Sequence, residues 1–467
     1  MGLGKSLTSI CITGCLYNKG VIKRVLIVSP SSVCAVWEKE LAQFADYQYS
    51  VAVLTGTKAN RLKELTALTK KPNLQVAVIN YEAAWRLLPE LLDFNPDLVI
   101  ADESQRIKSN SARQSKAMHK LGDRARYKLI LSGTPIQNNA VDLYSQYRFM
   151  DSSIFGTNFY SFRNRYCLMG GFQAHQIVGY QHEDELIRKA HSAAFRITKA
   201  EALDLPEQTF ENRYVNLTSK ERKVYDQLRR DGFTELENEE TITATTVLTK
   251  LLRLQQFTGG FLPDEAGRPQ VVNTAKLDAL SDILQDYVID GGGKLVIFAR
   301  FTAEIEAIGK LMDKLKISYA AIHGGVPIAE RGGIVKDFQE NPKTMVFLAQ
   351  LQCAGLGITL TAASVAVYYS LNFNYADYSQ SLARIHRIGQ RSNCHYINLL
   401  VEDSVDDKTL EALAEKDGIA KKLVDNWREY FGEGEPDEPP DDCSLADGWL
   451  RQIDARNKMS EKVYRGG

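Results

Sequence analysis

The sequence predicts an α/β protein built on parallel, doubly wound sheets, and three observations predict this class. Continuous apolar runs typical of strands buried on both faces, such as VLIV at 25–28, alternate with stretches of helical periodicity. One such run, DLVIADES at 97–104, ends in the adjacent acids Asp102 and Glu103. Ligand-binding residues of open α/β sheets lie at this end of the strands. The chain also opens with MGLGKS, and a glycine-rich turn ending in Lys-Ser is typical of a phosphate-binding loop.

Length and composition limit the class of protein further. A chain of 467 residues is too long for one ordinary core, so we expect two or three domains. It has 57 basic and 58 acidic residues, so the overall charge does not point to nucleic acid, although a local basic groove is compatible with it. No run approaches the roughly 18 apolar residues of a membrane span, so we expect no membrane partner. The seven cysteines form no CxxC pair, and we interpret them as reduced thiols of a cytoplasmic protein.

The glycine turn predicts how phosphates would be held. Gly2 and Gly4 would let backbone N–H groups approach phosphate oxygens, Lys5 would reach the β- and γ-phosphates, and the Ser6 hydroxyl would bind Mg²⁺. The helix expected at 7–16 would direct its N-terminus at the same anion.

The other predicted residues of the first half follow its strands. Asp102 would hold Mg²⁺, and Glu103 would orient and deprotonate the attacking water. Ser132 and Thr134, which follow a later strand, could sense the γ-phosphate and pass that signal on. The expected strands are VLIVSP (25–30), QVAVINYE (75–82), DLVIADES (97–104) and KLILSGTP (128–135).

The middle of the chain, 152–293, is less regular. It is rich in aromatic residues and then becomes helical, and three glycines at 291–293 precede the second half. We expect most of the aromatic side chains to be core residues and not surfaces for stacking bases. The first of them are Phe155, Phe159, Tyr160, Phe162 and Tyr166.

The second half repeats the pattern of strands and helices without a phosphate loop of its own. If QSLARIHRIGQ at 380–390 is helical, Gln380, Arg384 and Arg387 lie at i, i+4 and i+7 on one face. Such a face could be ordinary solvated surface, or it could complete a phosphate site on the far side of the nucleotide. The expected strands are KLVIFARF (294–301), SYAAIHGG (318–325), TMVFLAQ (344–350), VAVYYSLNF (365–373) and CHYINLLV (394–401).

We therefore expect four segments. They are a first lobe at 1–151, a mainly helical insertion at 152–293, a second lobe at 294–430, and an acidic, proline-rich linker with a short tail at 431–467.

The motifs taken together resemble a known family. MGLGKS, VLIVSP with WEKEL, DESQRIKS, LSGTPIQN, KLVIFARF, AGLGITLTAAS and QSLARIHRIGQ occur in the order of the Swi/Snf family of helicase-like ATPases, within helicase superfamily two. The resemblance covers roughly residues 1 to 430. It implies two RecA-like lobes, ATP and Mg²⁺ as cofactors, and double-stranded DNA as the partner along which the protein moves.

The resemblance also assigns roles by position. It implies that Arg384 and Arg387 are arginine fingers and that Gln380 faces the nucleotide beside them. The residues expected to bind nucleotide and Mg²⁺ are Gly2, Gly4, Lys5, Ser6 and Asp102, with Glu103 acting on the water. Gly355 and Gly357 would lie where the second lobe meets both DNA and ATP.

Three departures from the family pattern matter. Gln105 stands where many members have His, and we expect little loss because it keeps a hydrogen-bonding side chain. Ala383 replaces a common acid. Members also carry a strand just before MGLGK; without it we expect two unpaired edges and a hole in the core of the first sheet.

Three functions remain open. The leading hypothesis is an ATP-dependent translocase on double-stranded DNA, of bacterial or phage origin. The second is a truncated, inactive fragment that at most binds DNA. The third is a helicase that separates DNA strands or acts on RNA, and the HRIGQ motif argues against it.

Overall fold

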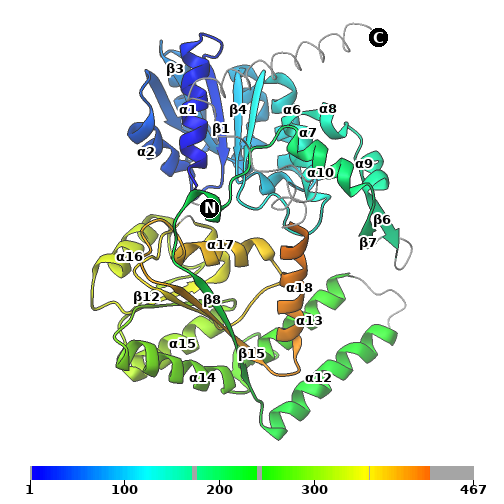
Figure 1. Cartoon of the computed structure of the whole chain (residues 1–467), viewed down its shortest axis with the longest axis vertical. Coiled ribbons are helices and arrows are strands. Elements are labelled where there is room, and N and C mark those ends of the chain that lie inside the picture. Colours follow the sequence, from blue (N-terminus) through cyan, green and yellow to red (C-terminus); the bar gives the residue numbers. More distant parts are fainter. Residues whose placement is uncertain (1–2, 171–175, 239–243, 357, 421–467) are drawn as a thin grey trace. The chain divides into compact units, whose positions relative to one another are not determined.

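The computed structural model of this chain describes residues 3–170, 176–238, 244–356 and 358–420. Within that part, 3–198 and 199–417 form two compact units, here called the N-terminal and C-terminal units. Each contains a parallel sheet with helices on both faces, which confirms the predicted fold class (Figure 1). The range 152–293, expected as an insertion, is divided between the two units at Thr198 and Lys199.

The sheet of the N-terminal unit has five parallel strands in the order β2-β3-β1-β4-β5. Its central strand β1 aligns Val25 with Val76 of β3 on one side and with Leu98 of β4 on the other. The strands are β1 (Arg24–Ser29), β2 (Tyr49–Val53), β3 (Leu74–Asn80), β4 (Leu98–Asp102) and β5 (Tyr127–Leu131). The helices around this sheet are α1 (Lys5–Asn18), α2 (Cys34–Phe44), α3 (Lys58–Thr69), α4 (Tyr81–Ala84), α5 (Leu88–Phe94), the 3-10 turn η1 (Ser104–Ile107) and α6 (Arg113–Arg124).

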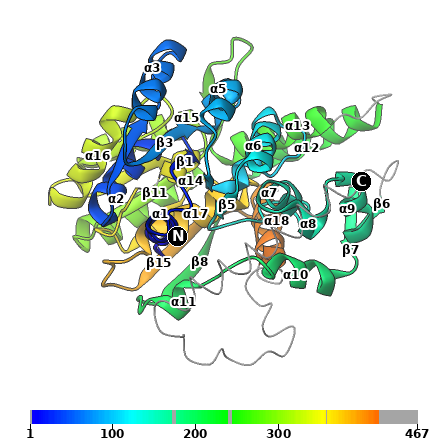
Figure 2. The same ribbon diagram turned by 90° about the horizontal axis from the view of Figure 1, so that it is seen from above.

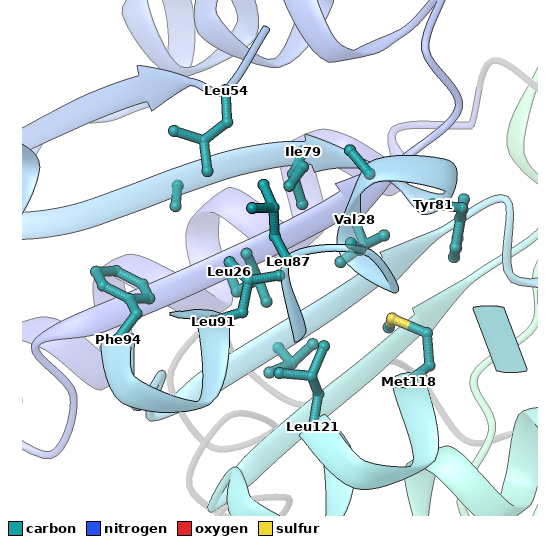
Figure 3. Close-up of a cluster of buried hydrophobic side chains, with 14 of the residues drawn as sticks. Leu26, Val28, Leu54, Ile79, Tyr81, Leu87, Leu91, Phe94, Met118 and Leu121 are labelled. Atoms are coloured by element: carbon teal, nitrogen blue, oxygen red, sulfur yellow. The ribbon is translucent and has the colours of Figure 1, made fainter. Parts of the chain in front are cut away.

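Burial on both faces explains the continuous apolar run of β1. Val25 and Ile27 pack among side chains of α1 and α2, whereas Leu26 and Val28 face a second cluster formed with α3, α5 and α6. Figure 3 shows part of that second cluster, in which Leu91 of α5 lies close to the strand. A strand covered on both sides has no polar face, so its sequence does not alternate.

The expected hole in this sheet is not found. The five strands form an uninterrupted ladder, so within the described residues no position between two of them is vacant. β5 is an outer strand, and its residues 128–131 are half-buried while β1 and β4 are almost wholly buried. The expectation of two unpaired edges in the middle of the sheet was wrong because β1, β4 and β5 pair directly with one another.

The aromatic residues after residue 151 are mostly core, as predicted. Phe155, Phe162 and Tyr166 are buried with residues of α7, and their rings meet at centroid distances of 5.0–6.0 Å. Tyr160 is the exception, with 65% of its surface exposed. Figure 2 shows the hairpin of β6 and β7 beside α9. The elements are α7 (Asp142–Met150), α8 (Ser152–Phe155), α9 (Phe159–Tyr166), β6 (Cys167–Gly170), β7 (Gln176–Tyr180) and α10 (Glu183–His191).

The C-terminal unit has a six-stranded parallel sheet in the order β12-β13-β11-β14-β15-β8. Five of the strands lie where the sequence predicts them. They are β11 (Leu295–Ala299), β12 (Tyr319–Ile322), β13 (Val346–Gln350), β14 (Val365–Tyr368) and β15 (Cys394–Val401).

The sixth strand was missed. β8 (Gln208–Val215) lies in the range expected to be helical, yet it pairs with β15 along all eight residues, from Gln208 opposite Cys394 to Val215 opposite Val401. It is an outer strand with mostly exposed side chains, so it lacks the apolar run that marks the buried strands.

Helices cover both faces of this second sheet. One core cluster joins the sheet to α14 and α15, and another joins it to α16, α17 and α18. The elements are α11 (Lys199–Ala202), α12 (Ser219–Asn238), α13 (Ala244–Thr258), the hairpin β9 (Phe261–Pro263) and β10 (Pro269–Val271), α14 (Ala275–Leu284), the π-helical turn η3 (Gln285–Asp290), α15 (Thr302–Leu315), α16 (Ile328–Glu340), the 3-10 turn η4 (Leu351–Leu356), α17 (Tyr375–Ile385) and α18 (Val405–Ala420). Among the described helices, none is long and apolar enough to cross a membrane.

Candidate active site

The glycine turn of the N-terminal unit leads directly into a helix. Gly4 has φ +75° and ψ 20°, a left-handed conformation that favours glycine, and its carbonyl accepts the first helical hydrogen bond from Thr8 at 2.8 Å. α1 begins at Lys5, and no side chain caps its N-terminus. The N–H groups of its first turn, including that of Ser6, therefore lack helical acceptors and suit an anion. Gly2 lies outside the described residues.

Asp102 ends β4 as a buried carboxylate, with 6% of its surface exposed. Trp37 donates its indole N–H to one carboxylate oxygen at 3.0 Å, and the N–H of Glu103 donates to the other at 3.0 Å. Burial, and next the neighbouring charge of Glu103, raise the pKa of Asp102 to about 6, while the positive charge of Lys5 lowers it. Lys5 is thus close enough to act on this carboxylate, and an added cation would favour its charged form.

A chain of hydrogen bonds runs from Glu103 to the loop after β5. Glu103 has φ +50°, and its carboxylate accepts a hydrogen bond from the side-chain amide of Gln105. The amide oxygen of Gln105 accepts from the Ser132 hydroxyl at 2.7 Å, and the Ser132 oxygen accepts from the N–H of Thr134 at 3.0 Å. The side-chain oxygen of Thr134 is buried without a hydrogen-bond partner among the described residues. The structure thus connects the predicted water-activating acid to both predicted sensor residues.

Sequence reasoning missed two aromatic residues that position the acids. Trp37, the first residue of the WEKEL motif, is 1% exposed and donates its indole N–H to Asp102 from α2. Tyr81 donates its hydroxyl to the backbone carbonyl of Asp102 at 2.7 Å. No signal in the sequence pairs residues so far apart in the chain, although a buried Trp or Tyr usually finds a polar partner.

The second group of predicted residues belongs to the C-terminal unit. Gln380 and Arg384 lie on α17 and are 9% and 2% exposed, so they are not a solvated surface. α17 ends at Ile385, and Arg387 follows it in a bend. The prediction that Arg387 shares a helical face with Gln380 and Arg384 was therefore wrong.

Arg384 instead contacts the glycine-bearing loop that follows η4. A guanidinium N–H donates to the carbonyl of Ile358 at 3.4 Å, and the Arg384 carbonyl accepts from the N–H of Leu360 at 2.9 Å. Gln390 also donates to this loop, at Ala363, over 2.8 Å. Gly355 lies within η4, and Gly357 lies outside the described residues.

The donor set limits which metal ion the protein could hold alone. In the described ranges, no three or more His, Cys, Asp or Glu side chains are grouped so that they could hold a metal ion. An ion bound near Asp102 would therefore need further oxygen ligands from a phosphate or from water, as Mg²⁺ commonly has.

Two family models match the chain. The SNF2-related domain matches residues 1–259, and the helicase conserved C-terminal domain matches residues 275–389. The chain belongs to the SNF2 family. This confirms the resemblance read from the motifs.

Curated relatives of this SNF2-family chain are distant but similar along most of it. Chromodomain-helicase-DNA-binding protein 1-like of Mus musculus is 26% identical over 455 residues, covering 94% of this chain and 49% of the relative. DNA repair and recombination protein RAD54-like of Drosophila yakuba is 25% identical over 469 residues, covering 91% of this chain and 59% of the relative. An uncharacterised ATP-dependent helicase of Mycoplasma genitalium is 24% identical over 427 residues, covering 91% of this chain and 40% of the relative. The chain thus spans about half the length of these relatives.

A solved structure is similar as well. The SWI2/SNF2 ATPase core of Sulfolobus solfataricus in complex with double-stranded DNA has 25% sequence identity and a TM-score of 0.39. The match covers 91% of this chain and 87% of that one.

Proposed function

We propose that this SNF2-family chain is a DNA-dependent ATPase that uses ATP and Mg²⁺ to move along double-stranded DNA or to remodel protein–DNA complexes. The observation that carries the proposal is the hydrogen-bonded chain from Glu103 through Gln105 to Ser132 and Thr134. These hydrogen bonds connect Glu103, the acid proposed to activate water, to Ser132 and Thr134, the residues proposed to sense the γ-phosphate.

Each predicted nucleotide-binding residue described in the N-terminal unit has a role in this proposal. Gly4 and the first turn of α1 bind phosphate oxygens, and Lys5 neutralises the β- and γ-phosphates. Mg²⁺ would supply charge neutralisation of the phosphates when bound, held through Ser6 and Asp102. Burial and the neighbouring charge of Glu103 raise the pKa of the Asp102 carboxyl, and a bound cation would favour its charged form.

Glu103 acts on the nucleophile. In this role its carboxylate accepts a proton from the attacking water as the water approaches the γ-phosphorus. The Gln105 amide holds the carboxylate in place by donating to one of its oxygens. Gln105 thus positions the Glu103 carboxylate by a hydrogen bond, as we expect of the His that many family members have at this position.

In the C-terminal unit, Arg387 is the better arginine finger of the two candidates. Arg384 is almost fully buried, and one of its guanidinium N–H groups donates to the carbonyl of Ile358, which ties the side chain to the glycine-bearing loop. Arg387 is half-buried and lies beyond the end of α17. Gln380, Gly355 and Gly357 would complete this side of the nucleotide site.

The test is ATP turnover by the purified chain without nucleic acid and with duplex DNA, single-stranded DNA or RNA. We expect duplex DNA to stimulate turnover most, and displacement of a third strand from a triplex to report movement without strand separation. No stimulation by any nucleic acid would refute the proposal. Stronger stimulation by RNA or single-stranded DNA would favour a different helicase class.

A further inference from the structure

One helix of the N-terminal unit carries a row of exposed cations that the ATPase site does not use. On α6, the side chains of Arg113, Lys116, Lys120 and Arg124 are all exposed. Their spacing of three, four and four residues places them on one face of the helix. We call these four residues the α6 stripe.

The α6 stripe lies opposite the face that holds the helix in the fold. Met118 and Leu121 are fully buried in the core shared with β1 and α5 (Figure 3). His119 bonds the carbonyl of Ser145 at 3.0 Å, and Ser115 donates to the carbonyl of Ile107 at 3.1 Å. The helix is therefore fixed from one side, and the stripe is carried on a rigid element.

The charges of the stripe are not balanced within the unit. Across the described residues, none of its four side chains forms an ion pair. Asp123, the acid of the same helix, is engaged by both terminal nitrogens of Arg148, at 2.7 and 3.0 Å. In a chain whose acids and bases are nearly equal in number, four neighbouring cations without a counter-charge are a local excess that attracts a polyanion.

A second observation marks the N-terminal end of the stripe. The guanidiniums of Arg113 and Arg86 each lie 5.3 Å from the ring centre of Trp85. Trp85 is half-buried just after α4, whereas both arginines are exposed. A stacked guanidinium keeps its N–H donors free in its own plane, which suits a phosphate better than an unsupported side chain does.

We propose that the α6 stripe, together with Arg86 and Trp85, is a binding ridge for the phosphate backbone of double-stranded DNA. The stripe covers the twelve residues from Arg113 to Arg124, and eleven steps of about 1.5 Å make it about 16 Å long. One DNA strand presents a phosphate about every 3.4 Å along the axis, so a ridge of this length spans about five phosphates. The ridge binds any sequence because it offers charge and no pattern for reading bases. The inference rests on the proposed function, which supplies duplex DNA as the partner.

The test compares two double variants of the full chain. Lys116→Gln with Lys120→Gln removes two charges from the stripe, and Lys63→Gln with Lys70→Gln removes two from exposed positions on and just after α3. Binding to a fluorescent 20-base-pair duplex is measured by anisotropy at several KCl concentrations. Because each phosphate contact contributes about 0.9 to the slope of log Kd against log salt, the stripe variant should lose about 1.8 from that slope. Its Kd at about 0.1 M salt should rise by up to about 60-fold, while the control variant stays within about twofold of the unmodified chain.

Trp85→Leu gives a second readout because it leaves every charge in place. We expect a weaker Kd with an unchanged salt slope, since the guanidiniums lose their support but not their charge. Equal thermal unfolding temperatures of the stripe, control and unmodified chains show that folding is not the cause.

The possible failures are distinguishable. If the unmodified chain does not bind duplex DNA, the proposed function fails. If it binds DNA and the stripe variant matches the control in slope and Kd, the ridge alone is refuted. If the stripe variant binds DNA more tightly and hydrolyses ATP faster without DNA, the stripe holds an acidic segment of this chain such as 433–442, which also overturns the proposal.

Discussion

The most direct test of the catalytic arrangement is Gln105→Ala. Gln105 is 6% exposed and makes two hydrogen bonds, donating to Glu103 and accepting from Ser132. Alanine removes both bonds and leaves the Glu103 carboxylate free to turn away from the attacking water.

The size of the effect follows from the bond to the carboxylate. A hydrogen bond to a charged group contributes about 1.5–3 kcal/mol. If all of it is expressed in the transition state, turnover falls by about 10- to 150-fold at 1.36 kcal/mol per factor of ten. ATP affinity should change by less than about twofold, because Gln105 acts on the water and not on the phosphates.

The assay is steady-state ATP hydrolysis with saturating duplex DNA, beside a binding titration with a fluorescent ATP analogue. Gln105→His should recover most of the turnover because an imidazole N–H can donate to Glu103. Gln43→Ala, at an exposed position of α2, is the matched control. Turnover of Gln105→Ala within threefold of the unmodified chain, or an equal loss of ATP affinity, would show that the link does not position the base.

Three further predictions concern the C-terminal unit. Arg387→Ala should lower turnover by about 10³- to 10⁵-fold with ATP affinity retained. Arg384→Ala should lower the unfolding temperature as well as turnover, because it removes a buried hydrogen bond to the carbonyl of Ile358. A lower unfolding temperature for Arg387→Ala, with the large loss of turnover only for Arg384→Ala, would mean that the arginine finger is misassigned. Burial raises the pKa of Glu304 to about 7 from 4.5, so its contribution to stability is complete below pH 4.5 and is lost as the pH rises toward 7. Relative to Glu304→Gln, urea unfolding should show a loss of about 2 kcal/mol between pH 5.5 and 8, and parallel curves for the two proteins would contradict this. Lys276, which is 1% exposed, forms an ion pair with Asp406. Lys276→Met should lower the free energy of unfolding by about 3–5 kcal/mol, because it leaves the buried Asp406 carboxylate without its counter-charge. Adding Asp406→Asn should recover part of that loss in the same urea titration.

Buried strands were the most predictable part of the fold. Residues 295–299 of β11 are all fully buried, so selection for apolar side chains acts on every position and leaves a continuous run. The acids at the end of β4 were predictable for the same reason, because they interrupt such a run at the edge where ligands bind.

The parts that sequence reasoning missed depend on long-range contacts or on exposed positions. β8 carries mostly polar, exposed side chains at the outer edge of its sheet, so it shows neither an apolar run nor the strict alternation that marks a half-buried strand. The end of α17 at Ile385 precedes any strong helix breaker, since Gly389 follows four residues later. Trp37 meets Asp102 across 65 residues, a pairing that no local pattern encodes.

The position of β8 has a consequence for how the protein can be divided and how it is made. The strand leaves the ribosome about 186 residues before β15, the strand beside it, since Gln208 pairs with Cys394. During synthesis the C-terminal sheet cannot close until nearly all of its residues have emerged, and contacts of such long sequence separation form slowly. A shortened chain that starts at Lys294, where the sequence places the second lobe, would lose β8 and expose all eight residues of the β15 edge to pairing with other molecules. A cut before Gln208 keeps that edge covered, so a second lobe expressed alone must begin at least 83 residues upstream of the glycine run that starts at Gly291 (291 − 208 = 83).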